Sequence, residues 1–357
     1  MNGSNAIKMK EITIQGTPYA RGYAYGQQCR EEIGVSIQVY DALFQDLKGI
    51  SWEKARKLSE FYLEKTQEFA PDYVKEMQGI ADGANIDLLD IAALNARTEI
   101  MFAQLKDAQE CTALSLMPPA TADGRVIAAQ NWDFYKQLRD SLVIVHVHQE
   151  GKPNFVMVSE AGMIGGIGMN DRGIGVLLNA LTTDTSCQGI PLRTRMRAML
   201  DAETLGEAYA KGSLAPTSVG HLVATHKDGV AIAFEMDSKT SETLLPEDGV
   251  WLHTNHYVGP KMYQSHNAVP RASTYIRYQR IKALVKEAHG NIKCEDVMKM
   301  LRDHAGHPYS LCTHENPKDP VKTQYVTNFS IIMDLTEGCF YLAPGNPCMS
   351  EFERYEI

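Results

Sequence analysis

The spacing of apolar residues divides the chain into a first part typical of helices and a second part typical of strands, with the change near residue 110. Residues 7–15 alternate between apolar and polar side chains, which is the period of a half-buried strand. Apolar positions then recur at helical spacing, and prolines or polar breaks end each segment. We expect helices at 19–47, 52–69, 72–83 and 87–104.

The second part carries short apolar runs bounded by polar turns. Strands are expected at 111–117, 125–134, 141–149, 154–162, 173–181, 219–225, 230–236, 249–252, 327–335 and 338–343, and helices at 191–212 and about 272–304. Turns of a few residues favour antiparallel pairing, because parallel strands need a crossover of a dozen or more residues. The sequence therefore predicts one α+β domain in which strands lie between helical layers, with residues 1–110 as a helix-rich segment and 111–357 as a strand-rich segment.

Composition and charge narrow the class of protein. Hydrophobic residues make up 44% of the chain and charged residues 22%, which is typical of a soluble globular protein. The net charge of −9 argues against a nucleic-acid partner, because phosphate binding requires clustered lysine and arginine. Apolar runs of signal-peptide or membrane-span length do not occur, so we expect a cytoplasmic protein without a membrane partner.

The cysteines indicate reduced thiols. There are seven, without CxxC spacing: Cys29, Cys111, Cys187, Cys294, Cys312, Cys339 and Cys348. An odd, dispersed set fits free thiols better than a disulfide framework, and all except Cys111 are interpreted as packing residues. His146 and His148 lie on one face of a predicted strand, but they lack a third ligand at a readable spacing. No metal site is therefore predicted.

Cys111 is the candidate nucleophile. It opens the first strand of the second part, and Asp133 ends the next strand, so a hairpin would bring the two together. A thiol is only a few per cent ionised at neutral pH and needs a base. A cut between Glu110 and Cys111 would supply one, since an α-amino group has a pKa of about 7.7–8.0. Asp133 would then orient that amine, and the Asn255 side-chain N–H would stabilise an oxyanion.

Several short motifs support this interpretation by their order along the chain. They are Gly16-Thr17-Pro18, Arg21-Gly22, Tyr25-Gly26, Leu94–Glu99, Cys111-Thr112, Gln130–Phe134, Glu160–Gly165, Asn170, Asn179, His253–His256 and Pro308–Cys312. In this order the chain resembles, over nearly its whole length, the acyl-coenzyme A:6-aminopenicillanic acid acyltransferases. These are self-cleaving cysteine N-terminal-nucleophile (Ntn) hydrolases related to penicillin V acylase and bile-salt hydrolase.

The resemblance implies an αββα sandwich of two antiparallel sheets between helical layers. It also implies self-cleavage before Cys111, with Cys111 as nucleophile, Asp133 as its helper and Asn255 as oxyanion donor. Residues 1–110 would stay bound as a small fragment. The substrate would be a small molecule with a linear amide bond or an acyl-coenzyme A thioester. No metal or organic cofactor is implied, although coenzyme A can enter as a co-substrate, and a homo-oligomer remains open.

Further residues are assigned supporting roles, and the chain departs from its fungal relatives at some positions. The supporting residues are Thr112, Asn131, Trp132, Asn179, Arg97 and Glu99. Arg97 and Glu99 are interpreted as an ion pair beneath the nucleophile's segment, or otherwise as participants in processing. The fungal members cut a Gly-Cys bond where this chain has Glu110, and they carry arginine where it has Thr313 and Gln324.

Two other hypotheses stay open at this point. An uncleaved thiol hydrolase would use His253 or His256 as the base for Cys111, as cysteine-histidine enzymes do. Such an enzyme would remain one intact chain and would lose activity when that histidine is replaced. A non-catalytic binding protein on the same scaffold would also remain intact, and its Cys111 would be inert to thiol reagents.

Overall fold

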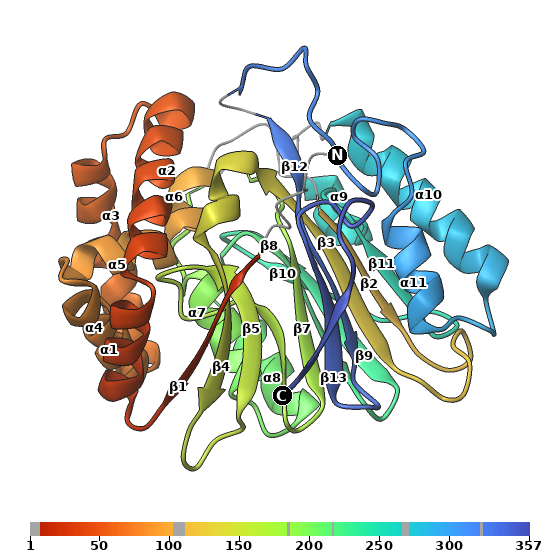
Figure 1. The fold of residues 1–357 in the computed structure, drawn as a ribbon, viewed down its shortest axis with the longest axis horizontal. Helices are drawn as coiled ribbons and strands as arrows, with labels where there is room; N and C mark the ends of the chain where they lie inside the picture. The colour runs from red at the N-terminus through yellow and green to blue at the C-terminus, as the bar shows by residue number, and fades with distance from the viewer. Residues whose placement is uncertain (1–7, 103–110, 184–185, 216–217, 266–270, 322–323) are drawn as a thin grey trace, which may run out of the picture.

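Two β-sheets face each other between two layers of helices (Figure 1). The structure is a computed structural model that describes residues 8–102, 111–183, 186–215, 218–265, 271–321 and 324–357. The N-terminal helices lie on one side of the sandwich, and α10 (Ala272–Ala288) and α11 (Cys294–Leu301) lie on the other. The αββα fold predicted from the sequence is confirmed by this order of layers.

The first sheet has eight strands and is covered by the N-terminal helices. Its order is β1 (Lys10–Gln15), β4 (Leu142–His148), β5 (Phe155–Glu160), β6 (Ile167–Asn170), β7 (Ile174–Asn179), β8 (Gly220–His226), β9 (Val230–Met236) and β10 (Ser241–Leu244). Neighbouring strands are antiparallel, except that β1 runs parallel to β4. A parallel pair is possible there because the whole N-terminal helical segment forms the crossover.

The second sheet has six strands and carries Cys111. Its order is β11 (Val250–His253), β2 (Cys111–Leu116), β3 (Ile127–Tyr135), β12 (Tyr325–Asp334), β13 (Cys339–Pro344) and β14 (Glu353–Glu356). The hairpin expected between β2 and β3 is present, with Cys111 opposite Trp132. The register between β12 and β3 shifts at a bulge between Thr327 and Phe329, beside Asp133. A bulge redirects side chains locally and is common next to active sites.

The helices of the first layer vary in length from six to 19 residues. They are α1 (Pro18–Gln28), α2 (Arg30–Lys48), α3 (Trp52–Phe69), α4 (Pro71–Ala84), α5 (Leu88–Asn95) and α6 (Arg97–Phe102), joined later by α7 (Leu192–Leu200) and α8 (Leu205–Gly212). The backbones of α1 and α4 touch, because a Cβ on Gly22 would lie 2.0 Å from the carbonyl oxygen of Glu76. Only glycine permits so close an approach.

Buried polar groups fasten the layers to one another. Gln130 of β3 reaches the opposite sheet, where its Nε2 donates to the Leu178 carbonyl at 2.6 Å and its Oε1 accepts from the Leu178 N–H at 3.1 Å. Between the first sheet and its helical layer, Glu160 accepts from Arg97 of α6 at 2.9 Å and from Arg193 of α7 at 2.7 Å. Burial alone would raise the pKa of Glu160, but the two arginines hold it below its usual value.

Several predicted helices are divided in the structure. The expected helix 19–47 breaks at Cys29, between α1 and α2. The expected helix 191–212 breaks before Thr204, whose side chain caps α8, and 272–304 breaks at Gly290, where φ is +88°. Periodicity missed these breaks because caps and a single glycine do not alter the apolar spacing. Three short strands (β6, β10 and β14) and the short helices α9 (Pro260–Ser265) and Lys136–Ser141 were also not predicted.

Among the described residues, no helix combines the length and the apolar character needed to cross a membrane.

Candidate active site

Cys111 is the first residue of β2 and is buried, with 1% of its surface exposed. Its Sγ lies 3.7 Å from the main-chain oxygen of Asp133 on the neighbouring strand. Burial, followed by the nearby Asp133, raises the pKa of the Cys111 thiol to about 12. In the intact chain this sulfur is therefore a protonated thiol at neutral pH, and it needs a base before it can act as a nucleophile.

The main-chain nitrogen of Cys111 donates to Oδ1 of Asn255 at 2.7 Å. The same Oδ1 accepts from Nη2 of Arg277 at 2.9 Å, while Nδ2 of Asn255 donates to the carbonyl of Ala180 at 3.0 Å. Two donors on one side and one acceptor on the other fix the orientation of this amide. Asn255, predicted as an oxyanion donor, therefore faces Cys111 with its oxygen, and one of its N–H groups is already engaged.

Arg277 of α10 was not recognised from the sequence. Its side chain is fully buried, and Nη1 donates to the main-chain oxygen of Cys111 at 2.6 Å and to Oγ1 of Thr112 at 3.1 Å. Thr274, one turn earlier on α10, accepts from the main-chain N–H of Asn255 at 2.8 Å. The only available signal was an arginine on the buried face of a predicted helix, since such a cation requires acceptors.

The Asp133 carboxylate is buried and held by two hydroxyl groups. Thr327 donates to Oδ1 at 2.6 Å, and the Thr313 hydroxyl shares its proton between Oδ2 at 3.1 Å and the Ser310 carbonyl at 2.9 Å. The sequence placed Asp133 beside Cys111, and the β2–β3 hairpin brings it there. Thr313 occupies one of the two positions at which the fungal relatives were expected to carry arginine, so here a neutral donor contacts the carboxylate. The role of Asp133 stays a prediction.

Asn179, at the end of β7, presents a buried amide whose Nδ2 has no hydrogen-bond partner among the described residues. The ring of His221 fixes its orientation. Nε2 of His221 accepts from the Trp251 indole at 3.1 Å, and burial lowers the pKa of His221 well below its usual value, so the ring is neutral. Its proton therefore sits on Nδ1 and is donated to Oδ1 of Asn179 at 3.0 Å. Asn179 consequently offers an unengaged N–H pair next to Ala180, which Asn255 contacts.

The supporting residues Asn131 and Trp132 have structural contacts. Nδ2 of Asn131 donates to the carbonyls of Leu301 and Leu311 at 2.9 and 2.7 Å, which fastens the loop after α11 to β3. The Trp132 ring packs on Phe134 and Phe329 at centroid distances of 5.2 and 5.4 Å. Both residues thus stabilise the strand on which Asp133 lies.

The expected ion pair between Arg97 and Glu99 is wrong. Arg97 pairs with Glu160, while Glu99 accepts from the main-chain N–H of Leu192 at 2.8 Å and from the hydroxyl of Ser218. Residues two apart on a helix do not face each other, which is why the two side chains of α6 separate. Burial raises the pKa of Glu99. Glu110, the predicted residue before the cut, lies outside the described residues.

The two histidines of the alternative thiol-hydrolase hypothesis lie against other groups. Nε2 of His253 contacts Glu235 at 2.9 Å, and its ring stacks on His221 with centroids 3.7 Å apart. His256 contacts the hydroxyl of Thr274 at 3.0 Å through Nδ1, and burial lowers the pKa of this ring to about 4. Within the described part of the chain, no imidazole is hydrogen-bonded to Sγ of Cys111.

Solved structures similar to this chain include a variant of conjugated bile acid hydrolase from Clostridium perfringens, with 14% identity, a TM-score of 0.48 and coverage of 69% of this chain and 97% of that one. Penicillin V acylase from Agrobacterium tumefaciens is 12% identical with a TM-score of 0.40, and the match covers 66% of this chain and 83% of that one. These likenesses are too remote to carry an argument, so the fold assignment rests on the layers and sheet order described above.

The sequence itself has nearer relatives. It is 28% identical over 334 residues to the acyl-coenzyme A:6-aminopenicillanic-acid-acyltransferase 40 kDa form of Emericella nidulans, covering 91% of this chain and 90% of that protein. It is 23% identical over 337 residues to an uncharacterized protein of Archaeoglobus fulgidus, and the match covers 79% of this chain and 55% of that protein.

The family model described as acyl-coenzyme A:6-aminopenicillanic acid acyl-transferase matches residues 120–348, well over half of the chain. The matched range begins after Cys111, so it supports the family without covering the candidate nucleophile. General acyl transfer or amide hydrolysis fits these relatives. This chain therefore belongs to the acyl-coenzyme A:6-aminopenicillanic acid acyltransferase family.

Proposed function

We propose that the chain is a precursor that cuts itself between Glu110 and Cys111, after which Cys111 is the nucleophile of an amide hydrolase or N-acyltransferase. The observation that carries this proposal is the 2.7 Å contact between the main-chain nitrogen of Cys111 and Oδ1 of Asn255. An acceptor aimed at this nitrogen suits both the amide N–H of the precursor and the amine that cleavage would create. Any buried main-chain N–H needs an acceptor, and here that acceptor is a side-chain amide oxygen, which can stay in place when the peptide nitrogen becomes an amine.

The cut itself is an N-to-S acyl shift. Sγ of Cys111 attacks the carbonyl carbon of Glu110, the peptide C–N bond breaks, and the nitrogen of Cys111 takes the proton. Water then hydrolyses the thioester, which gives a Glu110 carboxylate and regenerates the thiol. Asn255 and Arg277 hold the nitrogen and the carbonyl of Cys111 at 2.7 and 2.6 Å, and this fixes the residue while its sulfur reacts.

The mature reaction uses the new amine as the base. The α-amino group accepts the thiol proton, and the thiolate attacks the acyl carbonyl of the substrate. The ammonium then protonates the leaving amine or thiol, leaving an acyl group on Sγ. Water resolves this thioester in a hydrolase, and an acceptor amine resolves it in a transferase. A thiol whose pKa burial has raised to about 12 needs such an adjacent base.

The oxyanion of the tetrahedral intermediate requires N–H donors. The unengaged Nδ2 of Asn179 is the group best suited to this task, because one N–H of Asn255 already donates to the carbonyl of Ala180. We assign Asn255 to holding the amine and Asn179, together with the second N–H of Asn255, to the oxyanion. Removal of one such donor typically costs roughly 10²–10³ in rate.

The substrate class follows from this chemistry. Linear amides and acyl-coenzyme A thioesters both present an acyl carbonyl that a thiolate can attack. The neutral Thr313 beside Asp133, where the relatives were expected to carry arginine, favours a substrate without a carboxylate at that position.

The cysteines are free thiols, which fits the reducing environment of the cytoplasm.

The small fragment would remain bound after the cut. Glu76 of α4 accepts from Arg197 of α7 at 2.6 Å, and Glu160 of β5 accepts from Arg97 of α6, so buried ion pairs cross the boundary between residues 1–110 and 111–357. Breaking one such pair by removing a partner costs about 3–5 kcal/mol. The α1 and α4 backbones also pack against each other within the fragment.

Intact-mass spectrometry of the purified wild type, Cys111→Ala and Cys111→Ser tests the proposal. We expect the wild type to give two chains, residues 1–110 and 111–357, and Cys111→Ala to give one. Cys111→Ser retains a nucleophile and should cut more slowly. Each sample is then assayed for release of p-nitroaniline from a panel of N-acyl-p-nitroanilides.

Each outcome favours one hypothesis. Turnover that appears only in the two-chain samples supports the proposal. An intact, active wild type that loses turnover but keeps its fold in His253→Ala or His256→Ala would instead favour the thiol hydrolase. An intact wild type that is inert toward every anilide and acyl-coenzyme A thioester would leave a binding protein.

A further inference from the structure

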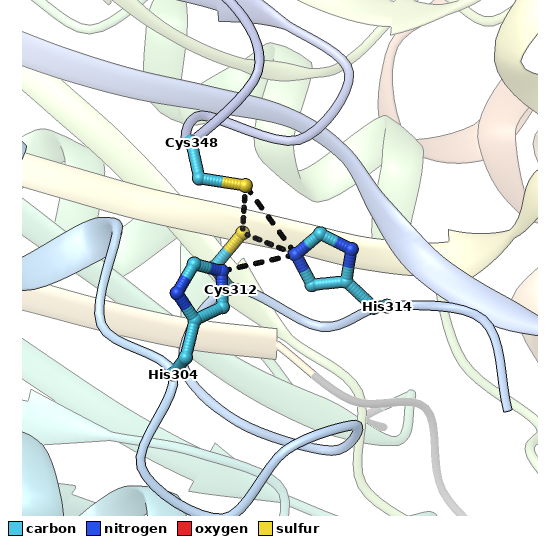
Figure 2. A group of neighbouring side chains, drawn as sticks. All are labelled: His304, Cys312, His314 and Cys348. Atoms are coloured by element: carbon cyan, nitrogen blue, oxygen red, sulfur yellow. Dashed lines mark hydrogen bonds between the residues drawn. The ribbon is translucent and has the colours of Figure 1, made fainter.

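Four side chains with nitrogen or sulfur donors converge at one end of the second sheet, near the start of β12 and the end of β13 (Figure 2). They are His304, Cys312, His314 and Cys348, here called the Cys312 cluster. His304 follows α11, Cys312 and His314 lie on the loop leading to β12, and Cys348 lies between β13 and β14. Figure 2 shows all four pointing toward a common centre, and their donor atoms lie within 4.8 Å of one another.

Four of the six separations between the donor atoms match the edges of a small tetrahedron. The two sulfurs are 3.6 Å apart, and Nε2 of His314 lies 3.5 Å from Sγ of Cys312 and 3.3 Å from Sγ of Cys348. The Nε2 atoms of His304 and His314 are 3.0 Å apart. A tetrahedral zinc with Zn–S of about 2.3 Å and Zn–N of about 2.0–2.1 Å has edges of about 3.8, 3.5 and 3.3 Å for S···S, S···N and N···N. These four edges agree with the zinc geometry to within about 0.3 Å, and the remaining two, from His304 to the sulfurs, lie within 4.8 Å.

The surrounding backbone is fixed by hydrogen bonds that do not involve the donor atoms. The main-chain N–H of Cys312 donates to Asp303 at 3.0 Å and that of His314 donates to Pro308 at 2.9 Å. Arg302 donates to the carbonyl of Pro347 at 2.8 Å, which ties the segment carrying Cys348 to α11. The ligands therefore come from three segments that are already held together. Such pre-organisation is expected of a binding site.

The side-chain amide of Asn346 is directed at Sγ of Cys312. Nδ2 of Asn346 lies 3.7 Å from Sγ of Cys312 and also donates to the carbonyl of Thr313 at 2.6 Å. N–H groups directed at a ligand sulfur stabilise its thiolate form and orient it, as outer groups do in known metal sites. A mere packing contact between two cysteines does not require this donor.

We infer that the Cys312 cluster binds one Zn²⁺ ion through two thiolates and two imidazoles. Two sulfur and two nitrogen donors in a tetrahedron select zinc among the common divalent ions. Binding releases the two thiol protons to solvent, and both histidines coordinate as neutral rings. With all four positions filled by protein, the ion has no open site for a substrate, so the role is structural. This inference does not depend on the reaction at Cys111.

The ion would act on the candidate active site through one residue. Thr313 lies between the ligands Cys312 and His314, and its hydroxyl donates to Oδ2 of Asp133 at 3.1 Å. A metal that fixes the two flanking residues also fixes this hydroxyl against the buried carboxylate. We therefore expect loss of zinc to weaken catalysis without preventing it.

The competing explanation is a disulfide between Cys312 and Cys348. A disulfide has sulfurs about 2.05 Å apart, far closer than the 3.6 Å of this pair. It would also leave the convergence of two imidazoles on the same point unexplained. The experiment below separates the two.

Metal analysis of the full-length protein, purified without chelator from zinc-supplemented medium, provides the test. We expect about one zinc per chain in the wild type. Reconstitution of the metal-free protein with Co²⁺ should give the visible bands of a tetrahedral site and a thiolate charge-transfer band. Cys312→Ser and Cys348→Ser should lose both signals. Cys339→Ser, at a buried cysteine outside the cluster, should keep them.

His304 supplies the variant that preserves folding, because its side chain is exposed. His304→Ala should weaken Zn²⁺ affinity by more than the roughly 10–100-fold lost when an outer-shell partner is removed. His307→Gln is the matched control, since that exposed ring lies 5.4 Å from the His314 ring outside the ligand set. Equal metal content in the wild type and Cys312→Ser, or a Cys312–Cys348 disulfide in wild type purified under reducing conditions, would overturn the inference. Iron or copper in place of zinc with the same ligand dependence would overturn the choice of metal.

Discussion

Cys111 and Cys312 are both buried cysteines on the second sheet or next to it, and burial raises the pKa of both thiols. Their neighbours nevertheless differ completely. Around Cys111 the contacts are a carbonyl, an amide oxygen and a guanidinium, each directed at a different atom of the residue. Around Cys312 a second thiol and two imidazoles are directed at one point. Burial and pKa therefore do not separate a nucleophile from a metal ligand, whereas the partners do.

The two regions meet at Asp133. Its carboxylate accepts from Thr327 of β12 and from Thr313, which stands between two residues of the Cys312 cluster. Substitution of Cys111 should abolish turnover and leave metal binding intact. Substitution of a ligand in the Cys312 cluster should remove the metal and reduce turnover only in part. Turnover and zinc content should therefore respond differently to substitutions in the two regions.

Cys111→Ala should produce the largest effect. Without the sulfur neither the acyl shift nor the acyl-enzyme can form, so we expect one uncut chain and a loss of turnover of roughly 10⁴-fold or more. Zinc content should match that of the wild type, because Cys111 is not one of the four proposed ligands. The measurements are turnover, intact mass and metal analysis on one preparation. A parallel loss of zinc would show that the two regions are not separable.

Asn179→Leu and Asn255→Leu should separate two roles. Asn179→Leu replaces the amide with a side chain that has no N–H, so that variant should still be cut but should turn over roughly 10²–10³-fold more slowly. Asn255→Leu removes the acceptor for the Cys111 nitrogen and should impair cutting as well as turnover. Processing is followed by mass and turnover by single-turnover kinetics. If Asn179→Leu turned over normally, the oxyanion assignment would fail.

Arg277→Lys should have an intermediate effect. A lysine cannot donate to Cys111, Thr112 and Asn255 together, because it lacks the planar fork of arginine. Loss of one charge-assisted hydrogen bond, worth about 1.5–3 kcal/mol, corresponds to roughly 10- to 100-fold in the rate of cutting. Lys282→Met, at an exposed position of the same helix, is the control and should cut normally. If Arg277→Lys were cut at a rate within about twofold of the control, the loss would be far smaller than expected. That result would argue against this positioning role.

Thr313→Val should have the smallest effect. It removes the hydroxyl that donates to Oδ2 of Asp133 and keeps both flanking ligands. The hydroxyl proton is shared with the Ser310 carbonyl at 2.9 Å, so we expect a loss of about 1 kcal/mol, below the roughly 1.5–3 kcal/mol of an unshared bond to a carboxylate. Turnover should therefore fall about fivefold while zinc content is unchanged. Thr313→Ser, which keeps the hydroxyl, should restore the rate. The coupling between cluster and carboxylate would be excluded if Thr313→Val and Thr313→Ser behaved alike.

The sequence predicted those features that depend on local pattern. Alternation located the strands, and the short turn between β2 and β3 was enough to place Asp133 beside Cys111. The order of motifs indicated the family and its layers. Helix ends were less accurate, because Thr204 caps and Gly290 turns the chain without disturbing apolar spacing.

Contacts between distant segments were beyond the reach of sequence patterns. Arg277 reaches Cys111 across 166 positions, and its helix was readable only as an amphipathic segment. The Cys312 cluster draws its ligands from three segments, so Cys348 gave no recognisable spacing with Cys312 and the sequence predicted no metal site. Arg97 and Glu99 were paired because they are close in sequence, although the α6 backbone directs them to different partners.

Mass spectrometry of the enzyme during turnover is the most direct test of the role of Cys111. The wild type would be mixed with an N-acyl-p-nitroanilide that it turns over, quenched in acid within one turnover, and its chains weighed. We expect the mass of one acyl group on the chain of residues 111–357, mapped to a free N-terminal Cys111. An acyl group on an uncut chain, or on any residue other than Cys111, would contradict this expectation.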